Sequence, residues 1–447
     1  MKTVEEHFHS VRLTTDRCQG CVSCTKRCPT EAIRIRGGKA QIISLRCIDC
    51  GECIRHCPCR AKAALTDDLA DLKNFQYNIA LPAPSLYGHF SADIPVDAIL
   101  SGLINLGFDD VFEVAQGAEI VTLAIRDYLK RPDIIRPAIS SACPAVVRLI
   151  QVKFPELIDH LVPFDAPVEV AARIARAEAA KALGIEADKI GVWFITPCPA
   201  KMTAVRRPLG SEKSNITGAI AINKIFNDLL KVVTADNQLV KSKASWVGVG
   251  WAVSGGETSA IDAENMLAVN DIQNVIDVLE QVALGKLKEV DYIEVLACAG
   301  GCIGGALTAE NRHVIEFNMK KRIKKKKSLD PTAGRLPRET YTDFELGSAG
   351  RRAIEPIPAL RLDEDIAKAM SKIEIMDKTL KTLPGLDCGS CGSPNCKALA
   401  EDIAQGLANK TDCVFILRKR TRDLAFAMVD LAVKLPPPLD KDHNDDY

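Results

Sequence analysis

The chain reads CQGCVSCTKRCP at residues 18–29 and CIDCGECIRHCP at residues 47–58, so the same cysteine pattern occurs twice near its start. In each copy, two residues separate each of the first three cysteines from the next, and a fourth cysteine comes directly before a proline. Three thiolates at this spacing can surround one side of an iron–sulfur cubane, whereas the fourth ligand has to come from elsewhere. Zinc sites rarely show this doubled spacing. We therefore predict two iron–sulfur clusters here rather than zinc.

The doubled run is that of the bacterial two-cluster ferredoxins, in which the fourth cysteine of each copy binds the other cluster. The first cluster is predicted to take Cys18, Cys21, Cys24 and Cys57. The second cluster is predicted to take Cys47, Cys50, Cys53 and Cys28. Cys59 is left over, and we expect it to be a spare buried thiol. Residues 1–72 are expected to fold as a small ferredoxin-like α+β domain around the two clusters.

Length and composition limit the class of protein. The chain has 447 residues, of which 47% are hydrophobic, and this suits a soluble protein of several domains of about 100–200 residues each. Its 58 basic residues balance its 58 acidic residues, which gives no support for a nucleic-acid or membrane-surface partner. No apolar run approaches the roughly 18 residues of a membrane span, and MKTVEEHFHS lacks a secretory signal. We therefore expect a cytoplasmic protein whose 17 cysteines bind metal rather than form disulfides.

A second group of four cysteines lies near the C-terminus, at Cys388, Cys391, Cys396 and Cys413. Glycines and a proline between them indicate a tight loop that can hold one metal centre. The spacing alone fits either a zinc site or a 4Fe-4S cluster. Because the same chain also carries the N-terminal iron–sulfur run, we favour 4Fe-4S. The segment resembles the small iron–sulfur domain of corrinoid and carbon-monoxide-dehydrogenase-linked proteins.

Four further cysteines lie singly or as a pair in the middle of the chain, at Cys143, Cys198, Cys298 and Cys302. They follow three short apolar runs that fit buried strands. Cys143 follows 137–139, Cys198 follows 189–195, and Cys298 and Cys302 both follow 292–296. Helical patterns such as 168–183 alternate with these runs, which indicates an α/β domain. Ligands of such domains sit beyond the carboxyl ends of the strands, so we expect the four thiolates to converge there. Any one of them alone would suit a buried core cysteine.

The motifs around these cysteines resemble those of the [FeFe]-hydrogenases, in the same order and over roughly residues 10 to 320. They are SSACP at 140–144, TPCPAK at 196–201 and ACAGGCIGG at 297–305. The resemblance implies a central α/β domain of two lobes that binds an H-cluster. This cofactor is a 4Fe-4S cubane joined through a thiolate to a two-iron centre with CO, cyanide and azadithiolate ligands.

The resemblance also implies roles for individual residues. Cys143, Cys198 and Cys298 would bind the cubane, and Cys302 would bridge to the two-iron centre. Lys201 matches a lysine whose ammonium contacts a cyanide, and Pro197 and Ser141 match positions that face the cyanides.

The function implied is the reversible heterolytic cleavage of dihydrogen to protons and electrons under anaerobic conditions. Electrons would leave through the N-terminal clusters, the C-terminal cluster or both. The expected partners are dihydrogen and protons, maturation proteins, and a redox partner such as ferredoxin or a downstream signalling protein. A symmetric homodimer is the default expectation for an oligomer.

Several positions depart from the catalytic members of the family. Ala142 stands where those members have a proton-relay cysteine, and Ile125 and Tyr128 stand where two glutamates continue the relay. These losses resemble the branch of the family proposed to be sensory, and they predict slow turnover. Glu257, in a glycine-rich loop, is our candidate for a substitute relay. A catalytic ferredoxin-linked hydrogenase and an iron–sulfur scaffold without the two-iron centre are the alternatives.

The rest of the chain predicts the domain boundaries. KKRIKKKK at 320–327 is typical of a solvated linker, and 363–383 has the pattern of a helix that ends before Pro384. The parts expected after the ferredoxin-like domain are the H-cluster domain at 73–318, a basic and irregular linker region at 319–360, the C-terminal 4Fe-4S domain at 361–432 and a disordered tail at 433–447.

Overall fold

The computed structural model describes residues 8–234, 239–331, 342 and 352–434, and the chain forms two compact units. The large unit comprises Met1–Cys18 and Ser44–Ala359, and the small unit comprises Gln19–Ile43 and Leu360–Tyr447. This division cuts through the expected domain at 1–72, because Cys18 and the second cysteine run belong to the large unit. Each unit is described by itself below.

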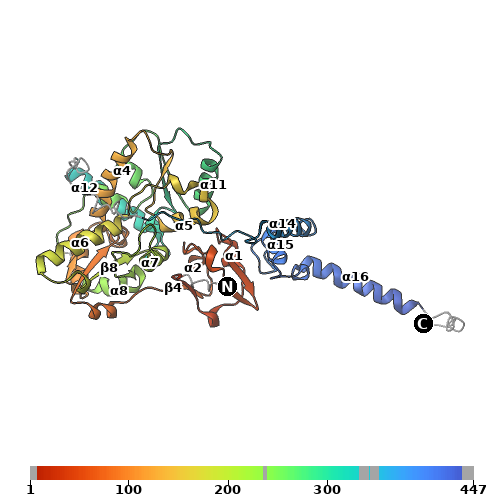
Figure 1. Ribbon diagram of the computed structural model, residues 1–447. Coiled ribbons are helices and arrows are strands. Elements are labelled where there is room, and N and C mark those ends of the chain that lie inside the picture. Colours follow the sequence, from red (N-terminus) through yellow and green to blue (C-terminus); the bar gives the residue numbers. More distant parts are fainter. Residues whose placement is uncertain (1–7, 235–238, 332–341, 343–351, 435–447) are drawn as a thin grey trace. The chain divides into compact units, whose positions relative to one another are not determined.

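The larger sheet of the large unit has four parallel strands in the order β6-β5-β8-β9. Every residue of β8 is buried, as is usual for a parallel strand with helices on both faces. Phe194 on β8 packs in the core formed with α6, whereas Trp193 packs in the core formed with α3 and α8. Helix α6 contacts β8 (Figure 1). The elements are β5 Tyr77–Pro82, β6 Asp110–Val111, β8 Ile190–Thr196, β9 Gly218–Ala221, α3 Val96–Asn105, α6 Pro167–Leu183 and α8 Ile222–Val232.

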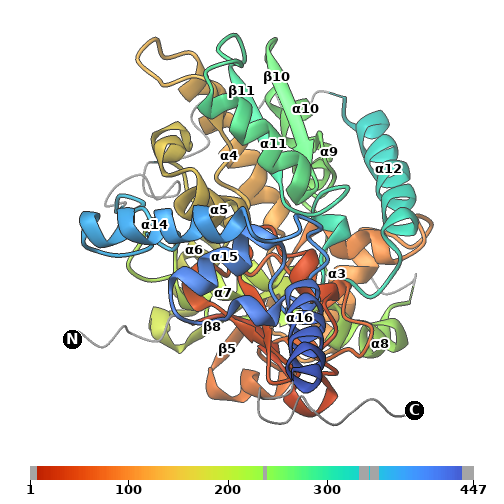
Figure 2. The ribbon, with the colours of Figure 1, turned by 90° about the vertical axis from the view of Figure 1, so that its right-hand side faces the viewer.

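A second, separate sheet has three parallel strands in the order β10-β11-β7. Figure 2 shows β10 and β11 together with α11, apart from β5 and β8. The predicted α/β fold is therefore confirmed, and its central part contains two parallel sheets. The elements are β7 Ala138–Ile139, β10 Met266–Asn270, β11 Tyr292–Leu296, α4 Val114–Leu129, α5 Pro144–Lys153, α7 Pro199–Arg206, α9 Trp246–Gly250, α10 Gly256–Ile261 and α11 Ile272–Ala283.

The ferredoxin-like residues form short antiparallel pairs in both units. In the large unit, β1 (Val11–Leu13) pairs with β4 (Lys62–Ala64), and α2 (Glu52–Arg55) lies within the second cysteine run. In the small unit, β2 (Ile33–Arg36) and β3 (Lys39–Ile42) form a hairpin, preceded by α1 (Ser23–Lys26). The hairpin turn is Gly37-Gly38, and both glycines have positive φ, as a two-residue turn of this type requires.

The C-terminal part of the small unit is helical. Helix α14 (Ile366–Leu380) lies within the predicted helix at 363–383 and packs on α15 (Cys396–Ala404). Helix α16 (Val414–Val433) follows, and the remainder of the expected tail, residues 435–447, lies outside the described residues. None of the helices in the described ranges has both the length and the apolarity needed to cross a membrane.

The prediction of an irregular linker from residue 319 was wrong in its first part, because α12 spans Arg312–Leu329. Arg322 is buried and donates hydrogen bonds to the carbonyl oxygens of Ile94 and Ser91. The ammonium of Lys327 lies 4.4 Å from the centre of the Trp246 ring. The aliphatic stems of basic side chains can cover apolar surface while their charged ends reach polar atoms, so the charge run is compatible with a docked helix. Residues 332–341 and 343–351 of this region lie outside the described residues.

Candidate functional site

The four central cysteines stand where strands of both sheets end. Cys143 follows β7 and is the N-cap residue of α5, and Cys198 follows β8 and is the N-cap residue of α7. In both cases a proline occupies the first helical position, where its missing N–H is not needed. Cys298 follows β11, and Cys302 begins a short 3-10 turn. The thiols that lie at helix N-termini are placed where the helix dipole favours a thiolate.

These thiols form one electrostatic group, although they come from two sheets. The pKa of Cys302 is raised to about 12, mainly by burial and also by the neighbouring Cys298 and Cys143 thiolates, whereas the Lys201 ammonium opposes this rise. Burial, followed by the neighbouring thiolates, also raises the pKa of Cys198. Without a metal, the thiols of Cys198 and Cys302 would therefore keep their protons at neutral pH. A metal centre that displaces those protons fits such a set of ligands.

Glycines bring the loops into contact. A Cβ at Gly305 would clash with the backbone of Pro197, and Gly301 has a positive φ of 93°. The N–H of Leu307 donates to the carbonyl oxygen of Pro197 at 2.9 Å. The glycines after Cys298 therefore allow the loop that follows β11 to lie directly on the loop that follows β8.

The second cysteine run also touches this site, which the sequence did not predict. Arg55 Nη2 donates to Cys298 Sγ at 2.9 Å and to the carbonyl oxygen of Gly304 at 2.6 Å. A Cβ at Gly51 would lie 2.6 Å from Ala306 Cβ, so the backbones approach closely. Arg55 thus links the ligand loop of the predicted second cluster to a ligand of the predicted cubane. Its position between Cys53 and Cys57 carried no signal of this long-range contact.

A cavity lies beside Cys302, and its volume is about 570 Å³ when the solvent-filled space at its mouth is included. Its lining is mostly apolar, with Cys302, Lys201, Glu257 and Ser85 as polar exceptions. Within the described residues, the Lys201 ammonium has no hydrogen-bond or ion-pair partner, and it lies 5.7 Å from the centre of the Phe194 ring. The other residues that line the cavity are Ala83, Pro84, Val114, Ala118, Ala142, Pro167, Phe194, Pro197, Trp251, Ala252 and Leu296.

This cavity suits a small group that carries negative charge and binds to a thiolate. An unpaired cation faces a thiol across apolar walls, and a cation in such surroundings interacts strongly with an anionic ligand. The residues present therefore fit the predicted two-iron centre with its cyanide ligands.

Glu257 is buried in the wall of the cavity and belongs to a hydrogen-bond network. Its carboxyl group accepts hydrogen bonds from Ser140 Oγ at 2.9 and 3.0 Å and from the Tyr292 hydroxyl. Burial, followed by the nearby Glu294 carboxylate, raises the pKa of Glu257 to about 8, although Tyr292, Ser140 and Lys201 oppose the shift. Glu257 therefore mostly holds its proton at neutral pH, at the edge of the cavity.

Three of the residues discussed for cyanide contact or for proton relay do not line this cavity. Ser141 lines a neighbouring cavity of about 610 Å³, and its hydroxyl donates to the carbonyl oxygen of Phe164 at 3.1 Å. Ile125 and Tyr128 both lie on α4; Ile125 is in the core, and the Tyr128 ring packs edge-on against Phe164, which precedes α6. The two cavities share Lys201 and Phe194 in their lining. The hydroxyl that reaches Glu257 is that of Ser140, a residue to which the sequence assigned no role.

The N-terminal cysteines fall into both compact units, so the structure leaves their assignment to two clusters as a sequence prediction. One local feature does repeat. Cys28 Sγ accepts a hydrogen bond from the N–H of Ala32 at 3.2 Å, and Cys57 Sγ accepts one from the N–H of Ala61 at 3.1 Å. Both acceptors are the cysteines before proline, and hydrogen bonds to ligand sulfurs tune iron–sulfur clusters.

A histidine near Cys47 was missed by the sequence analysis. His9 Nδ1 lies 2.7 Å from Asp49 Oδ2, and the ligand-type atoms of His9, Asp49 and Cys47 lie within 4.8 Å of one another. His9 Nε2 is buried and lacks a hydrogen-bond partner among the described residues. A histidine 38 positions before its cysteine gives no spacing signal, so only the fold brings it there.

The C-terminal cysteines also come together. Cys391, Cys396 and the buried Cys413 share one small core with Leu399. Hydrogen bonds from Ser390 lower the pKa of the exposed Cys388, and the Lys26 ammonium contributes a smaller effect in the same direction. The N–H of Cys396 donates to Asp387 Oδ1 at 2.7 Å, which fixes the loop at the start of α15. This arrangement fits one metal centre.

Comparison with protein families matches three parts of the chain. The family model "Iron only hydrogenase large subunit, C-terminal domain" matches residues 76–264 and 252–306. A "4Fe-4S dicluster domain" model matches residues 10–58, and a "Putative Fe-S cluster" model matches residues 383–415.

Curated relatives are similar at low identity. The NADP-reducing hydrogenase subunit HndD of Solidesulfovibrio fructosivorans is 24% identical over 344 residues, which cover 64% of this chain and 55% of that protein. The periplasmic iron hydrogenase large subunit of Nitratidesulfovibrio vulgaris is 24% identical over 367 residues, which cover 68% of this chain and 87% of that protein. The chain thus spans little more than half the length of the first of these relatives.

A solved structure of an [FeFe]-hydrogenase from Chlamydomonas reinhardtii matches with a TM-score of 0.46 and 15% identity. The match covers 65% of this chain and 98% of that one.

The raised pKa of Glu257 predicts a pH dependence of stability. A carboxyl group whose pKa is about 8 when folded and about 4.5 when unfolded binds more protons in the folded state. Its contribution to stability is complete below pH 4.5 and is lost as the pH rises through 8, at up to about 1.4 kcal/mol per pH unit. Glu257→Gln should therefore flatten the fall in unfolding free energy between pH 5 and 8, measured by denaturant titration.

The matched control is Glu264→Gln, which removes an exposed carboxylate a short way along the chain. It should reproduce the slope of the unchanged protein. Equal slopes for Glu257→Gln and the unchanged protein would contradict the assignment of a raised pKa to Glu257.

Proposed function

Because the chain belongs to the iron-only hydrogenase family, whose model spans more than half of it, we propose that its central cavity holds an H-cluster and reacts with dihydrogen. The chain is a hydrogenase-like iron–sulfur protein.

The observation that carries the proposal is the cavity beside Cys302. One of four converging thiols borders a mostly apolar space, and an unpaired lysine ammonium shares that space. A simple 4Fe-4S site needs four cysteines and no adjoining cavity. A bridging thiolate with a second metal group beyond it requires this additional space.

In this arrangement Cys143, Cys198 and Cys298 would bind the cubane, and Cys302 would bridge to the two-iron centre. When bound, the two-iron centre supplies the heterolytic cleavage of dihydrogen. The Lys201 ammonium would donate a hydrogen bond to a cyanide ligand. Pro197 would form part of the wall, with its carbonyl oxygen already bonded to the N–H of Leu307. Apolar neighbours such as Leu296 and Trp251 would exclude water.

The proton path is the part that departs from efficient catalysis. Ala142 lines the cavity and carries no group that can accept or donate a proton. Glu257 lines the same cavity, and its raised pKa lets it hold a proton near neutral pH. A single buried carboxyl bonded to Ser140 and Tyr292 would serve as a slower relay. We therefore propose low turnover, which suits a sensor of dihydrogen or of redox state.

Electrons would enter and leave through the ferredoxin-like clusters. The guanidinium of Arg55 bonds to Cys298 Sγ from within the second cysteine run. The second cluster would therefore be the first acceptor of electrons from the cubane. A one-electron carrier such as ferredoxin, or a downstream signalling protein, would complete the reaction.

Infrared spectroscopy tests the H-cluster directly. The anaerobically matured protein should show CO and cyanide stretching bands under inert gas, and these should shift under dihydrogen. Cys302→Ala should lose the bands, whereas Cys59→Ala should keep them, because Cys59 is not assigned to a cluster. Fully reconstituted cubanes without such bands would overturn the proposal.

The relay is tested by two substitutions. Ala142→Cys should raise the rate of dihydrogen oxidation by roughly tenfold or more, because a positioned acid–base group commonly contributes 10²–10⁴-fold. Glu257→Gln should lower both that rate and the exchange of dihydrogen with solvent deuterons. The two rates are measured by dye reduction and mass spectrometry. Unchanged exchange in Glu257→Gln, with Glu264→Gln as control, would exclude Glu257 as the relay.

The hydrogen bond from Arg55 to Cys298 predicts that a substitution of Arg55 shifts the reduction potential of the cubane. A charged donor to a ligand sulfur stabilises the more negative, reduced cluster. Arg55→Gln should lower its potential by roughly 60 mV, the equivalent of about 1.4 kcal/mol for one electron. A redox titration followed by electron paramagnetic resonance measures the shift. Arg60→Gln, an exposed arginine after the same run, should leave the potential unchanged, and an equal shift in both variants would argue against the contact.

A further inference from the structure

The small unit brings together two cysteine-rich stretches that lie far apart in the sequence. One contains Cys21, Cys24 and Cys28 of the first ferredoxin run, and the other contains the four C-terminal cysteines. The sequence alone suggested two separate electron outlets, one at each end of the chain. The contacts inside the small unit point to a different arrangement.

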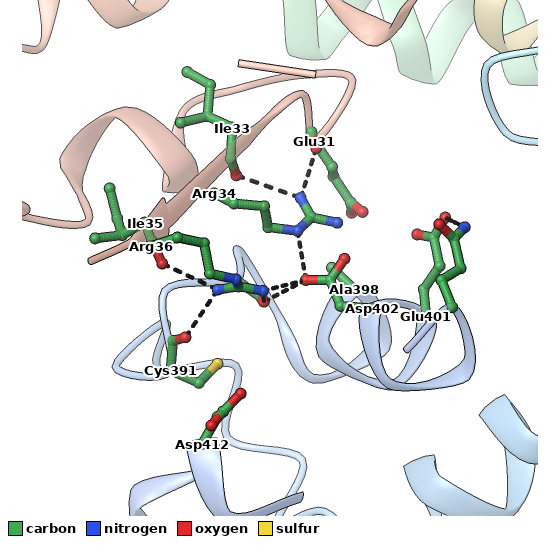
Figure 3. A network of polar contacts seen from close by, with 12 residues as sticks. Glu31, Ile33, Arg34, Ile35, Arg36, Cys391, Ala398, Glu401, Asp402 and Asp412 are labelled. Carbon is green, nitrogen blue, oxygen red and sulfur yellow. Dashed lines mark hydrogen bonds and ion pairs between the residues drawn. The ribbon is translucent and has the colours of Figure 1, made fainter. Parts of the chain in front are cut away.

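A buried ion pair holds the two stretches together (Figure 3). Asp402 Oδ2, on α15, accepts hydrogen bonds from Arg34 Nε and Arg36 Nη2, each at 2.7 Å. The side chains of Arg34 and Asp402 are 5% and 6% exposed. Ser393 Oγ donates to the same carboxylate oxygen at 2.8 Å. We call this group the Arg34–Arg36–Asp402 clamp.

The clamp reaches the backbone of the C-terminal ligand loop. Arg36 Nη1 donates to the carbonyl oxygen of Cys391 at 3.2 Å. The N–H of Ile35 donates to the carbonyl oxygen of Gly392 at 2.7 Å, so the hairpin strand β2 bonds to the residue after Cys391. Gly392 has a φ of 82°, and a Cβ there would clash with the carbonyl oxygen of Ile35. The loop is therefore shaped to lie on this strand.

The two ligand loops also touch each other. A Cβ at Gly389 would lie 3.0 Å from Lys26 Cε and 3.6 Å from Val22 Cβ. Gly389 follows Cys388, and Val22 follows Cys21. Residues next to ligands of the two predicted clusters are thus within van der Waals reach. Electron transfer between clusters weakens steeply with distance, so this closeness favours direct exchange.

We propose that the C-terminal iron–sulfur centre exchanges electrons directly with the first ferredoxin cluster, held in place by the Arg34–Arg36–Asp402 clamp. The proposal rests on the proposed function in one respect, namely that both cysteine sets hold iron–sulfur clusters. In the step, one electron leaves the reduced first cluster, which becomes oxidised, and the C-terminal cluster becomes reduced. No proton moves and no bond is made or broken. A one-electron acceptor outside the chain then reoxidises the C-terminal cluster.

The charge of the clamp bears on the C-terminal site. Two guanidinium groups share one carboxylate, so the clamp leaves net positive charge beside Cys391. Positive charge stabilises the reduced form of a cluster, which is the more negative one. The clamp therefore favours reduction of the C-terminal centre, and the carboxylate of Asp387, which accepts a hydrogen bond from the N–H of Cys396, acts in the opposite direction.

Electron paramagnetic resonance of the reduced full-length protein tests the proposal. The double variant Cys388→Ala/Cys391→Ala should lose one cluster, and the signal of the clusters that remain should also change. The expected changes are loss of magnetic splitting and slower spin relaxation. Cys59→Ala is the control and should leave the spectrum unchanged. If the double variant merely subtracts one simple, unsplit signal, the clusters are not neighbours and the proposal is overturned.

Asp402→Asn tests the clamp separately. It leaves two guanidinium groups against a neutral amide, so the splitting due to the C-terminal cluster should decrease and the amide of Ile35 should exchange hydrogen faster. Glu401→Gln, one residue earlier on α15, makes a similar charge change at a side chain bonded to Gln405 of its own helix, and should have neither effect. If Asp402→Asn fails to fold, the double cysteine variant still decides the question.

The outcomes separate this inference from the hydrogenase proposal. The infrared bands test the H-cluster and do not depend on the C-terminal cysteines. Zinc in place of iron at the C-terminal site, found by metal analysis, would overturn the electron-transfer inference while leaving the infrared result unaffected.

Discussion

Four thiols gathered at one point are the constraint on which the central part of the molecule depends. Burial and the neighbouring thiolates raise the pKa values of Cys198, Cys298 and Cys302, so as thiolates these three require a metal centre to balance their charge. Parallel strands of two different sheets deliver them, and glycines between Cys298 and Leu307 let the loops touch. The cavity lies beside Cys302, the thiol whose pKa rises to about 12, and it shares Lys201 with that thiol as a stabilising charge.

The same low-dielectric surroundings explain why Glu257 differs from an ordinary glutamate. An ionised Glu257 would be a buried negative charge next to Glu294, and this raises the free energy of the ionised form. Hydrogen bonds from Ser140 and Tyr292 offset only part of that cost, so Glu257 keeps its proton. Ala142 lines the cavity with a side chain that cannot carry a proton. Under the proposed function, the ligand set would be complete while the proton route would be reduced, and these two features together would favour detection of dihydrogen over rapid turnover.

Sequence patterns predicted the elements whose burial is continuous. The run 292–296 coincides with β11, and 168–183 differs from α6 by one residue, because apolar period and proline position mark such elements clearly. The prediction of a linker from the basic run at 320–327 was wrong, because charge alone does not reveal that Arg322 is buried against backbone carbonyls. Ser140, Arg55 and His9 are residues that the sequence did not single out. The contacts of Ser140 with Glu257 and of Arg55 with Cys298 are set by tertiary packing that no local spacing encodes.

Arg55 in the large unit and Arg36 in the small unit use the same chemistry. Arg55, in the second cysteine run, bonds to a ligand sulfur of the central site, and Arg36, in the hairpin after the first run, bonds to the carbonyl of a ligand in the C-terminal site. An arginine can bond to ligand atoms at a cluster edge and add positive charge without replacing a ligand. Each half of the ferredoxin-like segment is therefore committed to a different centre. A segment built in this way suits a bridge that carries electrons between two sites better than a terminal store of electrons.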